Sequence, residues 1–258
     1  MAIEIASPAR GRHAIATRYT PADLAILSEA EAGRFLQGGD PDPGRNLELA
    51  WELLYRIEPD LYDRLTRGER VHPGIIEWLP SRVERIVEVG TGSGRLTLEL
   101  VSRTGDLTAV EPAGALRERL IRRLAGRAGV RVVSGFFDSL PVEDRAAELV
   151  IACSALTPSP GHGADAGLNE MERVCAHGGM VVIVWPNHVE WLLQRGYIYR
   201  SFAGPMAVQF ESLEEAIELA EIFYPDALAE IRRRGDRRVP YEVLGKNPPR
   251  DLAFKVVS

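Results

Sequence analysis

The sequence predicts an α/β fold with a mostly parallel sheet, and three observations support this prediction. Short β-branched segments alternate with amphipathic helical segments through the middle of the chain. Two of the strand candidates, residues 86–89 and 106–111, carry an acidic residue near their ends. Three glycines, Gly90, Gly92 and Gly94, follow the first strand and open a helical segment. Such alternation is typical of parallel strands joined by crossover helices.

Composition limits the classes of protein that the chain can represent. Its 258 residues are 45% hydrophobic and 26% charged, enough for one α/β domain plus an appended segment. The formal charge of −6 argues against a basic nucleic-acid-binding surface. Cys153 and Cys175 stand at unrelated positions, so no disulfide framework is indicated and we expect a cytoplasmic protein. We find no secretion signal and no long apolar stretch, and therefore expect no membrane contact.

The glycine turn indicates a nucleotide-like cofactor. A strand that stops at Val89 and continues into glycines lets a ligand approach the backbone where any Cβ would collide. The dinucleotide fingerprint requires a small third residue where Arg95 stands, so NAD and FAD are disfavoured. The phosphate loop of nucleotide triphosphatases requires a Lys followed by Ser or Thr, and neither follows Gly94.

Residues 86–96 resemble motif I of the class I S-adenosylmethionine-dependent methyltransferases, in which an apolar strand precedes an acidic residue, one further residue and G-x-G-x-G. Glu88 occupies the acidic position. The resemblance implies S-adenosyl-L-methionine as cofactor, with Glu88 positioning its methionyl amino group directly or through water. It also implies a Rossmann-like sheet of seven strands with helices on both faces and a terminal antiparallel strand. The turn residues expected to contact the cofactor are Gly90, Thr91, Gly92, Ser93 and Gly94.

The segments after the turn continue the alternation. Residues 94–102 have helical patterning, and the strand over 106–111 ends at Glu111. A carboxylate at this position of a βαβ unit commonly meets a ribose diol, so we expect Glu111 to accept hydrogen bonds from ribose hydroxyls. Pro112 then opens a helix that runs to about residue 124. Glu111 and Pro112 are therefore expected beside the cofactor.

The third strand, residues 130–134, leads into a segment with two phenylalanines. GFFDSLP resembles the family's G-D-A-x-x-L-P segment, in which an acidic side chain usually accepts from the adenine amino group. Phe136 stands at the acidic position, and Phe137 and Asp138 follow. Two alternatives are equally supported: a phenylalanine ring covers the adenine face by stacking, or both rings pack in the core. In the first case Asp138 or the backbone would contact the adenine edge.

Residues 148–154 resemble the family's fourth strand, whose end faces the transferred methyl group. Cys153 and Ser154 are therefore expected near the cofactor at the carboxyl edge of the sheet. The D/N-P-P-Y/F motif of amide and base N-methyltransferases is absent from the sequence. The remaining predicted elements are a helix over 169–176, a glycine turn at 177–179, a strand over 180–185, a helix over 213–233 and a closing antiparallel pair over 239–244 and 252–257.

We predict two domains: an N-terminal helical extension over residues 1–70 and a cofactor-binding domain over residues 71–258. Helical patterning at 21–37 and 46–57 makes the extension either a lid over the cofactor or a packed helical layer. Residues 190–212 hold several aromatic side chains and form a candidate substrate cap. Contiguous aromatic residues in a concave site favour an apolar or aromatic small-molecule acceptor.

Methyl transfer from a sulfonium is an in-line displacement, in which positioning of the reactants supplies most of the acceleration. If the acceptor must lose a proton, His162 and His188 are candidate bases because they follow the fourth and fifth strands. No spacing of His, Asp and Glu indicates a metal site. We therefore expect a small-molecule methyltransferase, monomeric or homodimeric, with no nucleic-acid partner. The alternatives are a non-catalytic module that binds S-adenosylmethionine or S-adenosylhomocysteine, and an NAD(P)-linked oxidoreductase.

Overall fold

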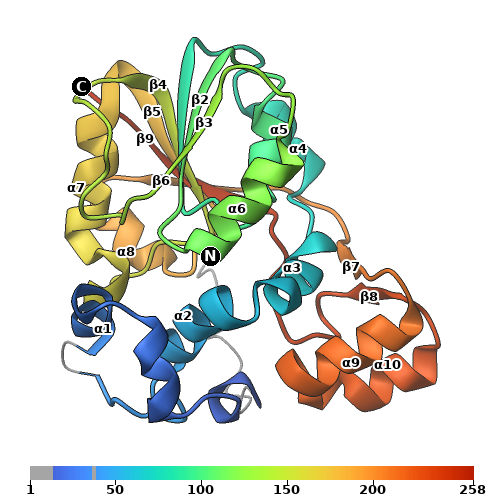
Figure 1. Cartoon of the computed structure of the whole chain (residues 1–258). Helices are drawn as coiled ribbons and strands as arrows, with labels where there is room; N and C mark the ends of the chain where they lie inside the picture. The colour runs from blue at the N-terminus through green and yellow to red at the C-terminus, as the bar shows by residue number, and fades with distance from the viewer. Residues whose placement is uncertain (1–13, 37–38) are drawn as a thin grey trace. The chain divides into compact units, whose positions relative to one another are not determined.

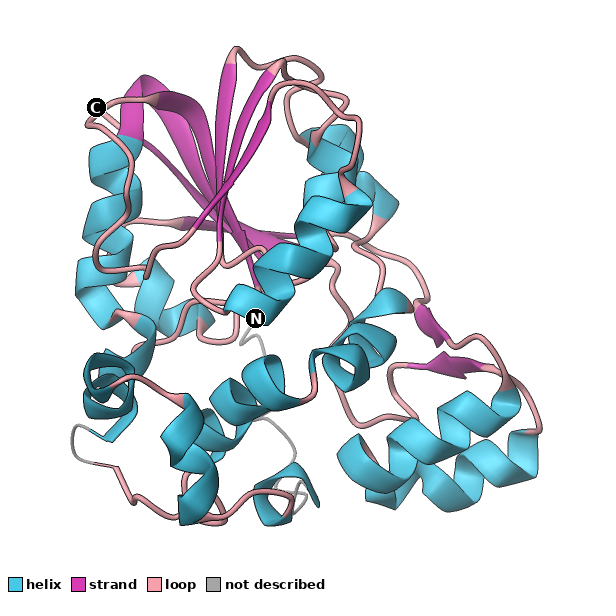
Figure 2. Cartoon of the chain, viewed as in Figure 1, coloured by secondary structure: helices cyan, strands magenta, loops and turns pink. Residues whose placement is uncertain are grey.

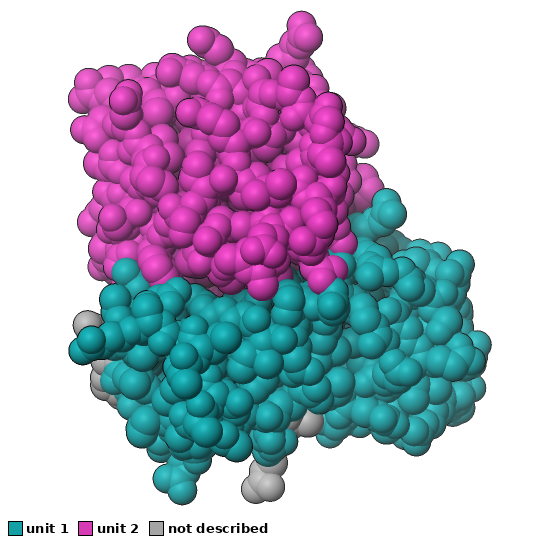
Figure 3. Space-filling model, viewed as in Figure 1, with its two compact units in different colours: residues 1–70, 204–248 teal, residues 71–203, 249–258 magenta. Residues whose placement is uncertain are grey.

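The chain divides into two compact units in the computed structural model, which describes residues 14–36 and 39–258 (Figure 3). Unit 1 comprises Met1–Arg70 and Gly204–Pro248, and unit 2 comprises Val71–Ala203 and Pro249–Ser258. Residues 204–248 therefore group with the N-terminal part of the chain, although the sequence placed them in a domain over 71–258. Residues 1–13 and 37–38 of the predicted extension lie outside the described residues.

A seven-stranded sheet forms the centre of unit 2 (Figures 1 and 2). The strand order is β3-β2-β1-β4-β5-β9-β6, and β9 runs antiparallel to both of its neighbours while the other pairs are parallel. The strands are β1 (Arg85–Val89), β2 (Asp106–Val110), β3 (Val130–Val133), β4 (Ala147–Cys153), β5 (Cys175–Val184), β6 (Ile198–Ser201) and β9 (Asp251–Val256). The predicted Rossmann-like, mostly parallel sheet with one antiparallel strand near the C-terminus is confirmed.

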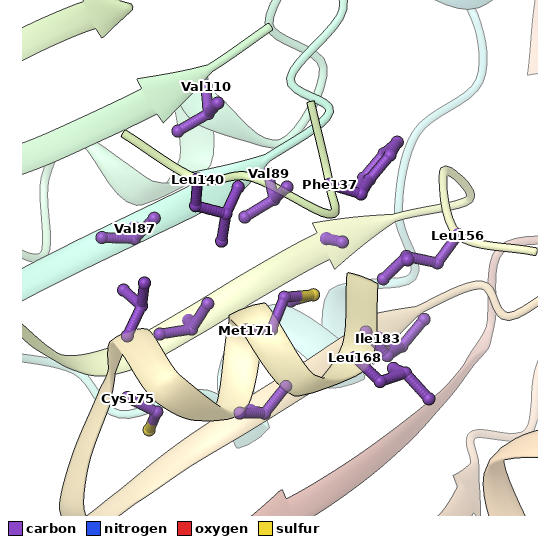
Figure 4. Packing of buried hydrophobic residues seen from close by; sticks show 14 of the residues in the cluster. Val87, Val89, Val110, Phe137, Leu140, Leu156, Leu168, Met171, Cys175 and Ile183 are labelled. Carbon is purple, nitrogen blue, oxygen red and sulfur yellow. The ribbon is translucent and has the colours of Figure 1, made fainter. Parts of the chain in front are cut away.

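Helices cover both faces of this sheet (Figure 1). On one face lie α4 (Pro73–Trp78), α5 (Thr97–Leu100) and α6 (Gly114–Arg123), and on the other lie α7 (Ala164–Val174) and α8 (Val189–Leu193), with the short 3₁₀ helix η3 (Pro160–His162) before α7. Leu168 and Met171 of α7 pack with Val87 and Val89 of β1 in one buried cluster (Figure 4). Burial of aliphatic side chains between helix and sheet is the main source of stability for such a layer.

Two predicted helices of unit 2 have the wrong limits. The helix expected over residues 94–102 is only α5, because the residues before it form a turn in which the Gly94 N–H donates to the Thr91 carbonyl at 3.0 Å. The helix expected over 169–176 begins earlier, at Ala164, and ends at Val174. The predicted glycine turn at 177–179 lies within β5, where the ladder with β4 has a register shift.

The predicted antiparallel pair over 239–244 and 252–257 is wrong. Residues Arg238–Pro240 form β8, which pairs in unit 1 with β7 (Ala207–Gln209), while β9 pairs with β5 and β6 in unit 2. Strand β6 comes from the segment over 190–212 that the sequence analysis treated as a cap. An alternating pattern identifies a strand but leaves its partner open, because several edges of suitable length compete for it.

Unit 1 consists mainly of helices. They are α1 (Glu29–Leu36), α2 (Leu47–Ile57), α3 (Pro59–Arg67), α9 (Leu213–Phe223) and α10 (Leu228–Arg234), with 3₁₀ helices η1 (Ala14–Thr17), η2 (Pro21–Ile26) and η4 (Pro225–Ala227). The Asn46 side chain caps α2 by accepting from the Leu49 N–H at 3.2 Å. The predicted helix over 213–233 is interrupted at Pro225, which lacks an N–H and disfavours helical geometry in the residue before it. Among the described residues, no helix has the length and hydropathy needed to cross a membrane.

Candidate functional site

The turn between β1 and α5 has a backbone that only glycine adopts without strain. Gly90 and Gly94 have φ angles of +69° and +102°. A Cβ on Gly90 would lie 2.8 Å from Cζ of Phe137 and 2.8 Å from Cβ of Ala155. The Gly90 N–H donates to the Val110 carbonyl at 2.9 Å, so β2 holds the turn in place. The result is a fixed cradle of bare backbone at the carboxyl end of β1.

Glu88 lies on β1 two residues before this turn, and its side chain is 2% exposed. Its Oε2 atom is buried without a hydrogen-bond partner. Burial raises the pKa of Glu88 to about 8, although Thr97 and Arg95 act to lower it. A buried carboxyl oxygen without a partner is costly, and a cationic donor supplied by a ligand would relieve that cost. Glu88 is therefore suited to receive an ammonium group.

Glu111 directly follows β2 and is 5% exposed. Its Oε2 atom accepts from the Gly92 N–H at 2.8 Å, and its Oε1 atom accepts from the Ala113 N–H at 2.9 Å. These charge-assisted bonds fix the plane of the carboxylate and tie the end of β2 to the glycine turn. The contact of Glu111 with the ribose diol of the cofactor stays a prediction. Pro112 is half-buried next to Glu111.

We expect the substitution Glu111→Ala to weaken binding of S-adenosylhomocysteine by roughly 1.5–3 kcal/mol, or about 10- to 100-fold, because charged hydrogen bonds to the ribose are lost. Isothermal titration calorimetry measures this change. Glu118→Ala is the control, since the Glu118 side chain on α6 is 75% exposed. Equal affinity of the two variants would remove Glu111 from the binding site.

Thr91 and Ser93 are both buried within the glycine turn. The Oγ1 atom of Thr91 is buried without a hydrogen-bond partner. Ser93 instead anchors α6, because its carbonyl oxygen accepts from Nη1 of Arg123 at 2.9 Å. Of these two side chains, Thr91 is thus the one with unused hydrogen-bonding capacity inside the cradle.

The two phenylalanines after β3 have different environments. Phe137 is buried, and a Cβ on Gly163 would lie 2.9 Å from its Cβ, so its ring fills the space between η3 and the glycine turn. Phe136 is only half-buried and makes an isolated bridge with Ser139. Core packing therefore accounts for Phe137, while Phe136 and the half-buried Asp138 stay predicted adenine contacts.

The carboxyl ends of β4 and β5 both finish in left-handed non-glycine residues. Ser154 has φ of +53° and Trp185 has φ of +51°. Such conformations cost on the order of 1–3 kcal/mol and are concentrated at ligand sites. The Ser154 hydroxyl lies 3.5 Å from Oδ1 of Asn187, and the neighbouring Cys153 is buried. The carboxyl edge of the sheet, where the sequence predicts the transferred methyl group, is therefore built from backbone of fixed conformation.

The two candidate bases follow these strands, as predicted. His162 ends η3, is half-buried, and has Nδ1 at 3.3 Å from Oγ1 of Thr157. Its neighbour Gly163 packs on Phe137, whose ring in turn contacts Gly90, so the loop that holds His162 approaches the glycine turn. His188 is exposed at the start of α8. Both roles stay predictions.

One pair of side chains in the site was missed by the sequence analysis. The guanidinium carbon of Arg95 lies 5.3 Å from the ring centroid of Trp185, which is 8% exposed at the end of β5. In the sequence, Arg95 was used only as an argument against a dinucleotide cofactor. Its position directly after Gly94 was the available signal, but its contact with Trp185, the residue after β5, depends on the strand order.

Dinucleotide-binding proteins of similar topology also place a carboxylate at the position of Glu111, so Glu111 alone does not exclude a dinucleotide. Glu88 is the additional buried carboxyl, and it lies on the strand just before the glycine turn. A cofactor that carries an ammonium group and a ribose diol is complementary to both. The orphaned oxygen of Glu88 fits the ammonium group of such a molecule. The class of protein that the fold and the site define is the class I S-adenosylmethionine-dependent methyltransferase.

Comparison with known families gives the same class. Residues 86–179 match the family model described as "Methyltransferase domain". The match begins in β1 and ends within β5, and it includes the glycine turn with Glu88 and Glu111. Over these residues the chain carries a methyltransferase domain, and the predictions of the methyltransferase family and of S-adenosyl-L-methionine as cofactor are confirmed.

Three known proteins show how far the similarity extends. The chain is 29% identical over 140 residues to an uncharacterized methyltransferase of Mycobacterium tuberculosis strain H37Rv. The aligned residues make up 52% of this chain and 54% of that protein. It is 34% identical over 111 residues to ribosomal RNA small subunit methyltransferase A of Moorella thermoacetica, covering 39% and 35%. The chain thus spans about half the length of the first relative. A chain in the complex of the Haloferax volcanii Trm112 methyltransferase activator superposes with a TM-score of 0.51 at 15% identity, covering 78% of this chain and 94% of that one, which shows the fold alone.

Proposed function

We propose that the protein transfers the methyl group of S-adenosylmethionine to a small-molecule acceptor. The observation that carries this proposal is the pair of buried carboxyls at the glycine turn, one with an unpartnered oxygen and one fixed by two backbone N–H groups. When bound, the cofactor supplies an electrophilic methyl group on a sulfonium with a neutral thioether as leaving group. The chain's own contribution is positioning, which is worth up to roughly 7–11 kcal/mol.

Removal of a proton from the acceptor is assigned to His162 or His188. If Nδ1 of His162 donates to Thr157, its Nε2 atom is the basic nitrogen. His188 stands after the end of β5, beyond Trp185. An acceptor that enters the site already deprotonated needs neither residue. A pH profile of turnover for His162→Asn and His188→Asn distinguishes these cases, because loss of a general base removes the alkaline rise in rate.

The acceptor is proposed to be an apolar or aromatic small molecule. The net charge of −6 gives the surface little attraction for nucleic acid. Similarity to a ribosomal RNA methyltransferase makes RNA the competing acceptor, so both classes belong in one screen. Transfer of a radiolabelled methyl group to small hydroxyl, amine or thiol compounds but not to RNA would support the proposal. The reverse result would replace it.

The first test is binding of S-adenosylmethionine, S-adenosylhomocysteine and NADH, measured side by side by calorimetry. We expect micromolar affinity for the first two ligands alone. NADH binding in their place would revive the oxidoreductase alternative. If none of the ligands binds, the glycine turn is scaffold and the enzyme assignment fails.

A second function is favoured by Phe136, which stands where the family usually has an acidic residue for the adenine amino group. A module that binds S-adenosylmethionine or S-adenosylhomocysteine without turnover would not need productive placement of the methyl group. Tight binding of both ligands, with no transfer to any acceptor in the screen, would select this function.

Further properties rest on the sequence and are proposed with the function. Residues 1–70 are proposed to act as a lid and residues 190–212 to contribute to the acceptor site. Hydrogen exchange tests the first role: protection of amides in α2 (Leu47–Ile57) on addition of S-adenosylhomocysteine is expected of a lid and not of a packed layer. A cytoplasmic, metal-free monomer or homodimer stays our expectation.

A further inference from the structure

Arg173 on α7 directs all of its side-chain donors at the loop between β3 and β4 and at its own helix. Its Nη2 atom donates to the Leu140 carbonyl at 3.2 Å, and its Nη1 atom donates to the Val142 carbonyl at 2.9 Å. The other N–H groups bind carboxylates, with Nη1 at 2.6 Å from Oδ1 of Asp144 and with Nε and Nη2 each at 2.7 Å from an oxygen of Glu170. A guanidinium has five N–H donors, so these five bonds fix its plane.

Leu140 is the residue of this loop that α7 holds at both of its backbone polar groups. Oε2 of Glu170 accepts from the Leu140 N–H at 2.9 Å, while Arg173 binds the Leu140 carbonyl. The Leu140 side chain is buried in the same cluster as Met171 of α7 (Figure 4). Arg173 and the Leu140 N–H hold the pKa of Glu170 below its usual range, so this carboxylate is negatively charged. A surface ion pair alone contributes little, but here both charges also satisfy backbone groups that would otherwise lose a partner.

A tight turn leads from β3 to Leu140, and both of its ends are fixed. Within the turn, the Ser139 N–H donates to the Phe136 carbonyl at 3.2 Å, and the two residues form an isolated bridge. Before the turn, the Val133 carbonyl at the end of β3 accepts from a backbone N–H that follows β2 at 3.1 Å. After the turn, Leu140 is held by α7. The half-buried residues Phe136 and Asp138, which are the predicted adenine contacts, therefore lie between two anchors.

We propose that Arg173 and Glu170 are positioning residues for the adenine of S-adenosylmethionine and act through the turn that carries Phe136 and Asp138. This proposal rests on the proposed binding of S-adenosylmethionine and on the predicted adenine contacts. Without the anchor on α7, the turn would move about its attachment to β3, and the adenine contacts would move with it. The glycine turn has a separate anchor on β2, through the hydrogen bond from the Gly90 N–H. Loss of Arg173 therefore affects the adenine part of the cofactor selectively.

The test compares S-adenosylhomocysteine with S-ribosylhomocysteine, which keeps the ribose and the amino acid and lacks adenine. We expect the unmodified protein to bind the first ligand about 10- to 100-fold more tightly by calorimetry, because stacking and hydrogen bonds of the base are lost in the second. Arg173→Met should lower this preference about 5- to 10-fold and leave the affinity for S-ribosylhomocysteine nearly unchanged. Arg173→Lys should recover only part of it, because an ammonium lacks the planar fork of donors. Arg145→Met is the control, since Arg145 is exposed on the same loop.

Hydrogen exchange measures the order of the turn without a cofactor. The amides of Ser139, Leu140 and Val142 should exchange about 10-fold faster in Arg173→Met, and Glu170→Gln should give a smaller increase. If Arg173→Met does not fold, Arg173→Gln and Glu170→Gln serve for the same comparison. Unchanged exchange, an unchanged preference, or an equal loss of affinity for both ligands would overturn the positioning role. If the unmodified protein binds neither ligand, the proposed function fails as well, and that result is distinct because it involves no variant.

Discussion

Gly92→Val is expected to lower the affinity for S-adenosylhomocysteine by on the order of 100-fold or more. Gly92 has φ of +55°, and a β-branched residue in that conformation is strained by about 1–3 kcal/mol. Movement of the turn to relieve the strain would break the hydrogen bond from the Gly92 N–H to Glu111, a charged bond worth about 1.5–3 kcal/mol. Both effects distort the glycine turn and displace the Glu111 carboxylate, which is predicted to bind the ribose. Calorimetric titration with S-adenosylhomocysteine measures the loss.

A matched control separates loss of the site from general strain. Gly126, just after α6, has φ of +81° with no heavy atom within 4 Å of a Cβ built on it. Gly126→Val should therefore lower the free energy of unfolding by the backbone strain alone, about 1–3 kcal/mol, and leave the affinity unchanged. The pair Gly92→Ala and Gly126→Ala repeats the comparison if the valine variants do not fold. Equal affinity across each pair would contradict a cofactor site at the turn.

Glu88→Gln is expected to increase the free energy of unfolding of the cofactor-free protein at pH 8 by on the order of 4 kcal/mol and to change little near pH 4.5. Burial raises the pKa of Glu88 to about 8 in the folded state, compared with 4.5 for an ordinary glutamate. The stability contributed by the neutral carboxyl is therefore fully present below pH 4.5 and is lost as the pH rises to about 8. Glutamine has the same shape and no charge, so it avoids that loss.

Urea unfolding at several pH values between 4.5 and 8.5 measures this effect. Glu99→Gln is the control, because Glu99 is exposed on α5 and its substitution should give a small difference at every pH. The same Glu88→Gln protein should bind S-adenosylmethionine more weakly, because the amide cannot neutralise the methionyl ammonium. A stability difference that does not vary with pH would show that Glu88 is ionised in the folded state.

The strands, the glycine turn and the two acidic positions were predictable because each depends on a few neighbouring residues. The run of β-branched residues before Val89 specifies β1, and glycines at alternating positions specify a backbone with positive φ. The carboxyl ends of parallel strands meet at one edge of a sheet, so the order of elements alone brought Glu88 and Glu111 together. Arg95 was also visible in the sequence, but only as an exception to a dinucleotide pattern.

Prediction failed where the outcome depends on competition between distant segments. Residues 238–240 form a strand as expected, yet they pair with β7 instead of β9. Residues 213–233 have a continuous apolar stripe, but Pro225 divides them into α9 and α10. The sequence left open whether Phe137 packs in the core, and its burial beside Gly90 and Gly163 depends on the tertiary fold.

The sequence by itself determined the α/β class, the glycine turn and the family, since hydrophobic periodicity and glycine spacing act over less than ten residues. Only the tertiary structure decided which strand pairs with which, that residues 204–248 group with the N-terminal helices, and that the Arg95 guanidinium lies 5.3 Å from the ring centroid of Trp185. These features follow from burial of whole faces and from the strand order of the sheet. Such contacts join residues far apart in the chain, where the free energy depends on the complete fold.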